Sequence, residues 1–339
     1  MARMRVSRSA LDTLAGAARL QASQSAQLLA AAGALPSATE WRAALRRFAL
    51  AAGALALGFG AVFFIAANWS MLSPAGRLWL LQGLFALSMA AALWRPAPHH
   101  VGRAGLLLAF IGVGALFALF GQTFQTGADV HELFAMWALL ALPLVFAARW
   151  SLVTAAWLLV GNTALALFCG VVPGQHPLWL LLGFGEHSWA LRLLIAMLPN
   201  LLLWAVAEWR ATRDPPIDAL LPRWLRRLLL VAGLGYGTLA ACVAIVDGRD
   251  VAPTVLGYLC AAAAVAALCF HSRREALGPV TLAASGVLLG LAVLVRVMPD
   301  GGDEMALLLL PLWVVASSAV AGLLLVPLVR RWEGDTHEA

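Results

Sequence analysis

The feature that most constrains this chain is a series of ten apolar runs, each close to the ~20 residues that a helix needs to cross a hydrocarbon core about 30 Å thick. Of the 339 residues, 62% are hydrophobic and only 12% are charged, whereas a soluble domain carries about 25% charged residues. The sequence therefore predicts an all-α polytopic membrane helix bundle with about ten transmembrane helices, surrounded by the lipid bilayer. The predicted spans are about 48–67, 76–94, 104–121, 131–148, 151–172, 189–208, 228–247, 251–270, 279–297 and 306–328.

All 23 basic residues are arginines, and their distribution predicts the orientation of the spans. With both termini cytoplasmic, nineteen arginines lie on the cytoplasmic side, and the other four are Arg77, Arg192, Arg249 and Arg296. This asymmetry is what the positive-inside rule requires. We expect Arg192 and Arg296 to lie near outer helix ends and to snorkel to the headgroups. The net charge of +6 follows from these topology signals, so it gives no reason to expect nucleic acid as a partner.

The composition, rich in arginine and alanine, suggests a GC-rich bacterial genome, so we expect the bacterial inner (plasma) membrane. Before the first run, apolar residues recur at helical spacing between residues 11 and 35, and Ser37 with Glu40 has the pattern of a capping box for a second helix. Segment 177–185 is too short to span and is expected to be interfacial or re-entrant. Three regions are predicted: a cytoplasmic N-terminal helical region (1–47), a first bundle of five spans (48–172), and a second bundle of five spans with a short cytoplasmic tail (173–339).

Small and polar residues inside the runs predict how the helices pack. Asn162 and Asn200 lie in the middle of runs and are expected to form hydrogen bonds between helices. The N-terminal helix is a candidate contact for a membrane-protein partner. Further candidate contact faces come from glycine pairs with four-residue spacing, which permits close helix approach: Gly233/Gly237 and Gly286/Gly290.

A polar island interrupts the apolar pattern between residues 120 and 134, and the predicted topology puts it on the outside together with the loop after the first span. Polar groups in hydrocarbon are costly, so they gather where water or function admits them. We interpret the two loops as one outward-facing site, in which Arg77 would hold an anion, the amides would form hydrogen bonds, and His131 with Glu132 would handle protons. The candidate site residues are Asn68, Trp69, Arg77, Gln122, Gln125, Asp129, His131 and Glu132.

A structural interpretation of the same residues stays open. Asp129 and Glu132 fit the N-cap and third position of a helix, Trp69 fits an interfacial aromatic belt, and Arg77 could pair with headgroups. No metal site is expected, because a zinc-binding HExxH motif needs a second histidine where this chain has Ala135. The chain carries no nucleotide-binding or hydrolase motif and no metal-ligand spacing of cysteines, so the sequence supports no cofactor and gives no indication of an enzyme.

Several of these residues also carry a likeness to a known family. The motifs are Ala66-Ala67-Asn68-Trp69 at the end of the first run, Arg77 at the start of the second, and Phe120-Gly121-Gln122-Thr123-Phe124-Gln125 through Leu133-Phe134. Over about residues 10–150 the chain resembles the predicted bacterial membrane proteins of the domain-of-unknown-function (DUF) 2157 family. It departs from the family pattern at Phe124, where a tyrosine is expected. The resemblance implies a multi-pass inner-membrane protein and leaves its activity open.

Two functions follow from this sequence. The first is a transporter, or a solute- or lipid-handling protein, with an outward-facing polar site. The alternative is a non-catalytic accessory or scaffold subunit of a cell-envelope membrane complex, and a membrane enzyme comes third. A cluster of the polar residues beneath a cavity would favour the first function, whereas a filled bundle with those residues apart on its surface would favour the second.

Overall fold

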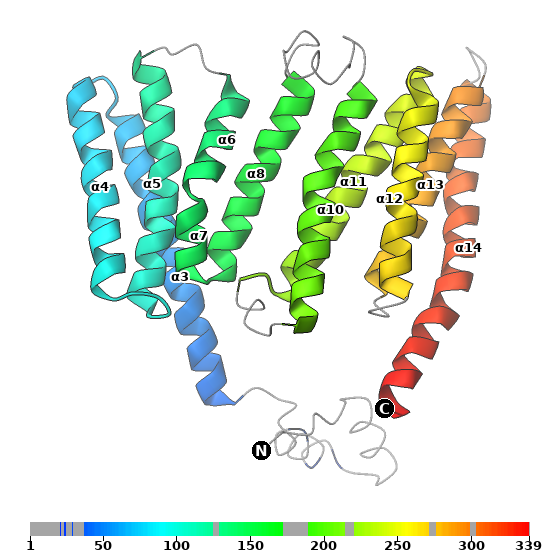
Figure 1. Cartoon of the computed structure of the whole chain (residues 1–339), viewed down its shortest axis with the longest axis horizontal. Coiled ribbons are helices and arrows are strands. Elements are labelled where there is room, and N and C mark those ends of the chain that lie inside the picture. Colours follow the sequence, from blue (N-terminus) through cyan, green and yellow to red (C-terminus); the bar gives the residue numbers. More distant parts are fainter. Residues whose placement is uncertain are drawn as a thin grey trace. The chain divides into compact units, whose positions relative to one another are not determined.

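The computed structural model describes Gln21, Gln24, Leu29 and residues 37–124, 129–171, 189–213, 220–270, 276–298 and 303–338. Gln125, all of segment 177–185 and, apart from Gln21, Gln24 and Leu29, the predicted helix between residues 11 and 35 lie outside this set. All regular secondary structure in the described residues is helical (Figure 1). The helices are α3 (Ala38–Ala67), α4 (Pro74–Trp94), α5 (His100–Phe124), α6 (Val130–Leu140), α7 (Leu142–Ala148), α8 (Ser151–Val171), α10 (Trp189–Arg213), α11 (Arg223–Asp247), α12 (Val251–Leu268), α13 (Leu277–Val297) and α14 (Asp303–Glu338).

Within the described residues, nine helices are long and apolar enough to cross a membrane, and the number is ten if α6 and α7 form one bent span. The all-α membrane fold and the predicted runs are thereby confirmed. The α6–α7 pair bends by 40° at Ala141 (Figure 1). Pro143, in the first turn of α7, has no backbone N–H and its ring collides with the carbonyl four residues earlier, which breaks the helix. The cytoplasmic location of both termini and the division into three regions remain predictions.

The helix starts follow the sequence signals. The Ser37 hydroxyl accepts a 3.2 Å hydrogen bond from Glu40 N–H, and the Glu40 carboxylate accepts one of 2.8 Å from Ser37 N–H. This confirms the capping box, and α3 then continues without a break into the first apolar run. At the start of α4 the Ser73 hydroxyl accepts from Gly76 N–H at 3.1 Å, and Pro74 takes the first helical position, where its missing N–H costs nothing.

The chain forms two compact units, Met1–Gly112 and Val113–Ala339, with the boundary inside α5. In the first unit, glycines of α3 and α5 allow close helix packing. A Cβ placed on Gly58 would lie 2.8 Å from Ile111 Cδ1, and one on Gly105 would lie 2.6 Å from the Ser88 carbonyl oxygen of α4. A side chain at position 105 would meet the α4 backbone and push the two helices apart, whereas the Ile111 side chain could move aside for one at position 58.

In the second unit α11 is the central helix, because it packs against α10, α12 and α13. The glycine pair on α11 permits this: a Cβ on Gly233 would lie 2.6 Å from Leu201 Cδ2, and one on Gly237 would lie 2.5 Å from Met197 Sδ. The predicted close approach is thus present, and the neighbours are the chain's own helices. On α13, a Cβ on Gly290 would overlap the Trp313 ring of α14, whereas Gly286 faces open space.

The structure corrects the expectation for Arg192. Its side chain is only 1% exposed and is among the largest fully buried side chains, so it does not snorkel to the headgroups. Arg192 lies in the first turns of α10, which packs against α8, and its backbone carbonyl accepts a hydrogen bond from Cys169 Sγ of α8 at 3.4 Å. Arg296, in the last turn of α13, is exposed as expected.

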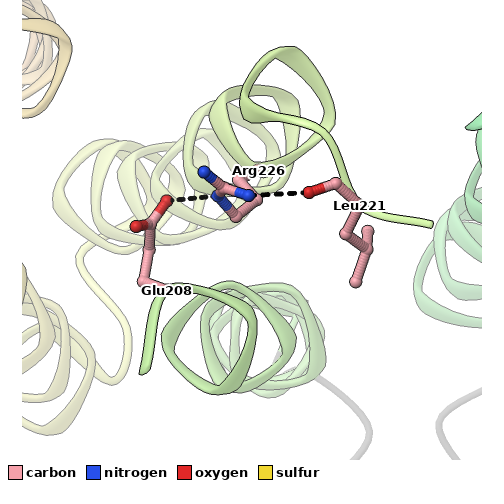
Figure 2. A network of polar contacts seen from close by, with 3 residues as sticks. All are labelled: Glu208, Leu221 and Arg226. Carbon is pink, nitrogen blue, oxygen red and sulfur yellow. Dashed lines mark hydrogen bonds and ion pairs between the residues drawn. The ribbon is translucent and has the colours of Figure 1, made fainter. Parts of the chain in front are cut away.

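Side-chain hydrogen bonds join the helices of the second unit. Asn162 of α8 and Asn200 of α10 exchange amide hydrogen bonds of 3.2 and 3.0 Å, which confirms the expectation for these two residues. The Ser285 hydroxyl of α13 is bonded to Thr238 of α11 at 2.6 Å and to Tyr258 of α12. Near the ends of α10 and α11, Arg226 pairs with Glu208 and also donates to the Leu221 carbonyl (Figure 2).

Candidate functional site

A cavity of about 1090 Å³ lies between the C-terminal end of α5, the part of α6 from Val130 to Ala138 and the second half of α8, all within the second unit. Its walls are mostly apolar, and its polar lining residues are Gln122, Asp129, His131 and Glu132. Small residues on all three helices line the cavity. These small residues are Ala118, Gly121, Ala135, Gly161 and Ala164.

The cavity has a polar end and an apolar depth. Gln122 lies near the end of α5 and Asp129 precedes α6, whereas Ala138 on α6 and Gly161 on α8 line its deeper part. At a rise of 1.5 Å per residue, the distance from Asp129 to Ala138 along α6 is roughly 13 Å. Half of a hydrocarbon core is about 15 Å thick, so the length of the cavity is comparable with the thickness of one leaflet, and its polar residues lie at the helix ends.

The polar end is organised by the start of α6. The Glu132 carboxylate accepts a 3.2 Å hydrogen bond from Asp129 N–H, which is the reciprocal bond of a capping box. The Asp129 side chain is 64% exposed, and its Oδ2 lies 4.0 Å from His131 Nδ1. His131 is buried, and its ring centroid is 5.3 Å from that of Phe168 on α8. The capping interpretation therefore holds, with Asp129 as N-cap and Glu132 at the third position of a capping box, and both residues also line the cavity.

The other predicted site residues lie in the first unit, at the turn between α3 and α4. The Arg77 guanidinium lies 3.7 Å from the centroid of the Trp69 ring and donates a hydrogen bond to the Trp69 carbonyl. Asn68 is the C-cap of α3, and its Nδ2 donates to the Phe64 carbonyl at 2.8 Å. These bonds satisfy backbone groups of the turn itself.

Residues 12–154 match the family model described as "Predicted membrane protein (DUF2157)". The expected resemblance over about residues 10–150 is confirmed. The matched segment includes α3 to α7, and thus the α5 and α6 walls of the cavity, whereas the cavity residues of α8 lie beyond it. No curated protein and no solved structure matches the chain. The family description and the apolar helices agree that the chain is a multi-pass membrane protein.

Of the eight predicted site residues, the structure brings four to the cavity and places three at the α3–α4 turn, while Gln125 lies outside the described residues. Since the two groups belong to different units, one site that contains Arg77 and Asp129 together remains a prediction. Among the described residues, no three His, Cys, Asp or Glu side chains come together in a way that could hold a metal ion.

Sequence reasoning missed the contribution of α8. Gly161, Ala164, Leu165 and Phe168 line the cavity, and their spacing of three, four and seven residues puts them on one helix face. That spacing was visible in the sequence. However, these four residues are apolar, like most of α8, so hydropathy could not distinguish a cavity wall from a face that contacts lipid or another helix.

Proposed function

We propose that this protein handles lipids: it takes an amphiphilic molecule from the outer leaflet of a bacterial inner membrane into the cavity between α5, α6 and α8. The observation that carries the proposal is the cavity itself, with apolar walls in its depth and polar residues at the helix ends. An amphiphile has the same distribution of chemistry along its length. Ligand cavities in proteins commonly measure about 300–1,000 Å³, so a volume of about 1090 Å³ is large enough for an acyl chain with a small headgroup.

The location of the cavity supports a ligand that arrives from the bilayer. Met136, a lining residue in the middle of α6, is 43% exposed, so the cavity is open along the side of the helix as well as at its polar end. A lipid could enter sideways without leaving the hydrocarbon phase. A water-soluble solute would instead meet apolar walls through most of the depth.

A structural role in an envelope complex is the second candidate. It is favoured by α14. The segment Leu308–Arg330 of this helix is long and apolar enough to cross the membrane, and 0% of its most apolar stretch is buried against the rest of the described chain. A partner helix could cover this surface, although lipid would suit it equally well. Lipid handling would use the cavity of α5, α6 and α8, whereas a structural role would use the surface of α14, so the two functions involve different residues.

The proposal can be tested by photo-crosslinking in nanodiscs with an amphiphile that carries a diazirine in its acyl chain and a neutral headgroup. We expect labelled peptides from the cavity walls of α5, α6 and α8. Gly161→Leu should reduce this labelling severalfold, because a Cβ at Gly161 meets nothing within 4 Å and a leucine would fill the cavity. Gly286→Leu is the matched control, since Gly286 also faces open space but lies on α13. Equal labelling of all lipid-facing helices, unchanged by Gly161→Leu, would contradict the proposal.

A further inference from the structure

The charges at the mouth of the cavity are unbalanced. Asp129 and Glu132 contribute two carboxylates, and the lining residues of the described chain include no arginine. The N-terminus of α6 contributes the equivalent of about half a positive charge. The sum is therefore about −1.5, and it would be about −0.5 with His131 protonated. Either way the mouth is negative, so it attracts a cation and repels a phosphate or sulfate group.

Aromatic rings line the same end of the cavity. Phe120 of α5 is half exposed and packs against Phe124, with ring centroids 4.6 Å apart. Phe168 of α8 lies on the other side, next to His131. Carboxylates combined with aromatic faces are the surroundings in which proteins hold ammonium groups, because the ring faces carry negative potential. Near the bilayer this attraction is screened less than it would be in water.

The positions of these groups fit a lipid-like molecule in one orientation. The carboxylates lie at the helix ends, at the level of the headgroups, and the apolar walls extend roughly 13 Å from them at 1.5 Å per residue. A headgroup cation placed between Asp129 and Glu132 would leave its hydrocarbon chain along the walls formed by Met136, Leu165 and Phe117. Gln122 could add a hydrogen bond through its side-chain amide, which is exposed at the cavity rim.

We propose that the occupant of this cavity is an outer-leaflet amphiphile with a cationic amine headgroup, held by Asp129 and Glu132 at the mouth and by the apolar walls below. This inference rests on the proposed lipid-handling function and specifies the chemistry of its ligand. The amphiphile comes from the bilayer, because the cavity walls that would contact its hydrocarbon chain are open to the lipid. Neutral and anionic amphiphiles are the competing occupants that the experiment must distinguish.

The test is a competition against the neutral photoactivatable amphiphile in nanodiscs made of an uncharged glycolipid, so that the bilayer itself supplies no ammonium headgroup and does not concentrate cations. Three competitors share a dodecyl chain and carry a trimethylammonium, an oligo(ethylene glycol) or a phosphate headgroup, and each concentration is corrected for partition into the bilayer. We expect the ammonium compound to displace the label at about tenfold lower concentration than the neutral one, as a cation–π and carboxylate site predicts. The phosphate compound should be the weakest competitor.

Conservative variants separate charge from structure. Glu132→Gln keeps an acceptor for Asp129 N–H, and Asp129→Asn keeps a good N-cap residue. The double variant should lose the preference for ammonium while the neutral compound still competes as before. Asp250→Asn is the control, because it removes an exposed carboxylate before α12 that does not line the cavity.

The outcomes separate the two proposals. Equal competition by all three headgroups, stronger competition by phosphate, or an ammonium preference that survives in the double variant would overturn the amine inference and leave lipid binding in place. If no competitor displaces the label, or if the label never reaches the cavity walls, the lipid-handling function itself is wrong.

Discussion

The Arg226 guanidinium donates a 2.7 Å hydrogen bond to the Glu208 carboxylate, and this pair joins the start of α11 to the end of α10 (Figure 2). The same guanidinium donates to the Leu221 carbonyl at 2.8 Å. The two side chains are only 8% and 14% exposed, so both charges have lost most of their water. A pair of this kind is costly to leave incomplete, because the remaining charge stays buried without compensation.

Arg226→Ala should therefore destabilise the bundle by about 3–5 kcal/mol, as measured for broken buried ion pairs. The double variant Glu208→Leu/Arg226→Met should lose less than Arg226→Ala, since it leaves no isolated charge. Reversible unfolding in mixed micelles measures both. Arg227→Ala is the control, because Arg227 is the neighbouring residue but is exposed. If the double variant is as unstable as Arg226→Ala, the loss of stability does not come from the isolated charge of Glu208.

The Asn162–Asn200 pair gives a second prediction. Its reciprocal amide bonds join α8 and α10, and Asn200 is only 3% exposed. Interhelical hydrogen bonds of this kind contribute about 0.6–1.7 kcal/mol in membrane proteins, so we expect a coupling energy in that range in a double-mutant cycle with Asn162→Ala and Asn200→Ala. Thr163→Ala is the control, because the Thr163 hydroxyl bonds only to the Leu159 carbonyl of its own helix among the contacts described. Additive effects of the two asparagine variants would mean that the pair does not stabilise the bundle.

Two glycines of α13 allow a matched comparison. A Cβ on Gly290 would overlap the Trp313 ring, whose Nε1 donates to the Val287 carbonyl at 2.9 Å, while a Cβ on Gly286 meets nothing within 4 Å. Gly290→Ala should cost about 1–3 kcal/mol through overpacking and should loosen α14. Gly286→Ala should be neutral or should stabilise by up to about 1 kcal/mol, because alanine favours the helix. Thermal melting and hydrogen exchange of α14 peptides measure the two effects, and similar exchange in both variants would contradict the packing of Trp313 on Gly290.

Most helix boundaries could be predicted from the sequence. In hydrocarbon every backbone N–H and C=O must be bonded internally, so an apolar run of membrane-spanning length becomes a helix. The predicted run 76–94 corresponds to α4, Pro74–Trp94, and the run 151–172 to α8, Ser151–Val171. The caps Ser37 and Ser73 were predictable for a different reason, since their hydroxyls act within one helical turn.

Which face of each helix contacts its neighbours was harder to predict than where the helix begins and ends. Lipid tails and leucines are equally apolar, so the hydrophobic effect does not decide which face of a membrane helix meets its neighbours. The burial of Arg192 and the cavity wall on α8 depend on that choice. By contrast, the Asn162–Asn200 pair was predictable, because a polar side chain in the middle of a span needs a partner and finds one on the next helix.

The predicted link between Arg77 and Asp129 is open to a double-mutant cycle. Arg77 already contacts Trp69 through its guanidinium, so a cycle with Arg77→Ala and Trp69→Ala supplies the positive reference. If Arg77 and Asp129 share one site, removal of either partner should cost the other its charged hydrogen bond, with a coupling of about 1–3 kcal/mol. Thermal melting in detergent measures both cycles. Additive effects of Arg77→Ala and Asp129→Ala would separate the α3–α4 turn from the cavity.

The topology of the α6–α7 pair decides on which side of the membrane every later part of the chain lies, including its C-terminal end. If the bent pair crosses the membrane, reporter fusions after Asp129, Asp250 and Gly301 should be periplasmic, and fusions after Arg149, Arg213 and the C-terminus should be cytoplasmic. The positive-inside rule predicts this arrangement from the asymmetry of nineteen arginines against four. If α6 and α7 instead enter and leave on one side, the fusion after Arg149 becomes periplasmic and every later reporter inverts. The Arg149 fusion is therefore the decisive measurement, because it alone lies directly after the bend and before any further span.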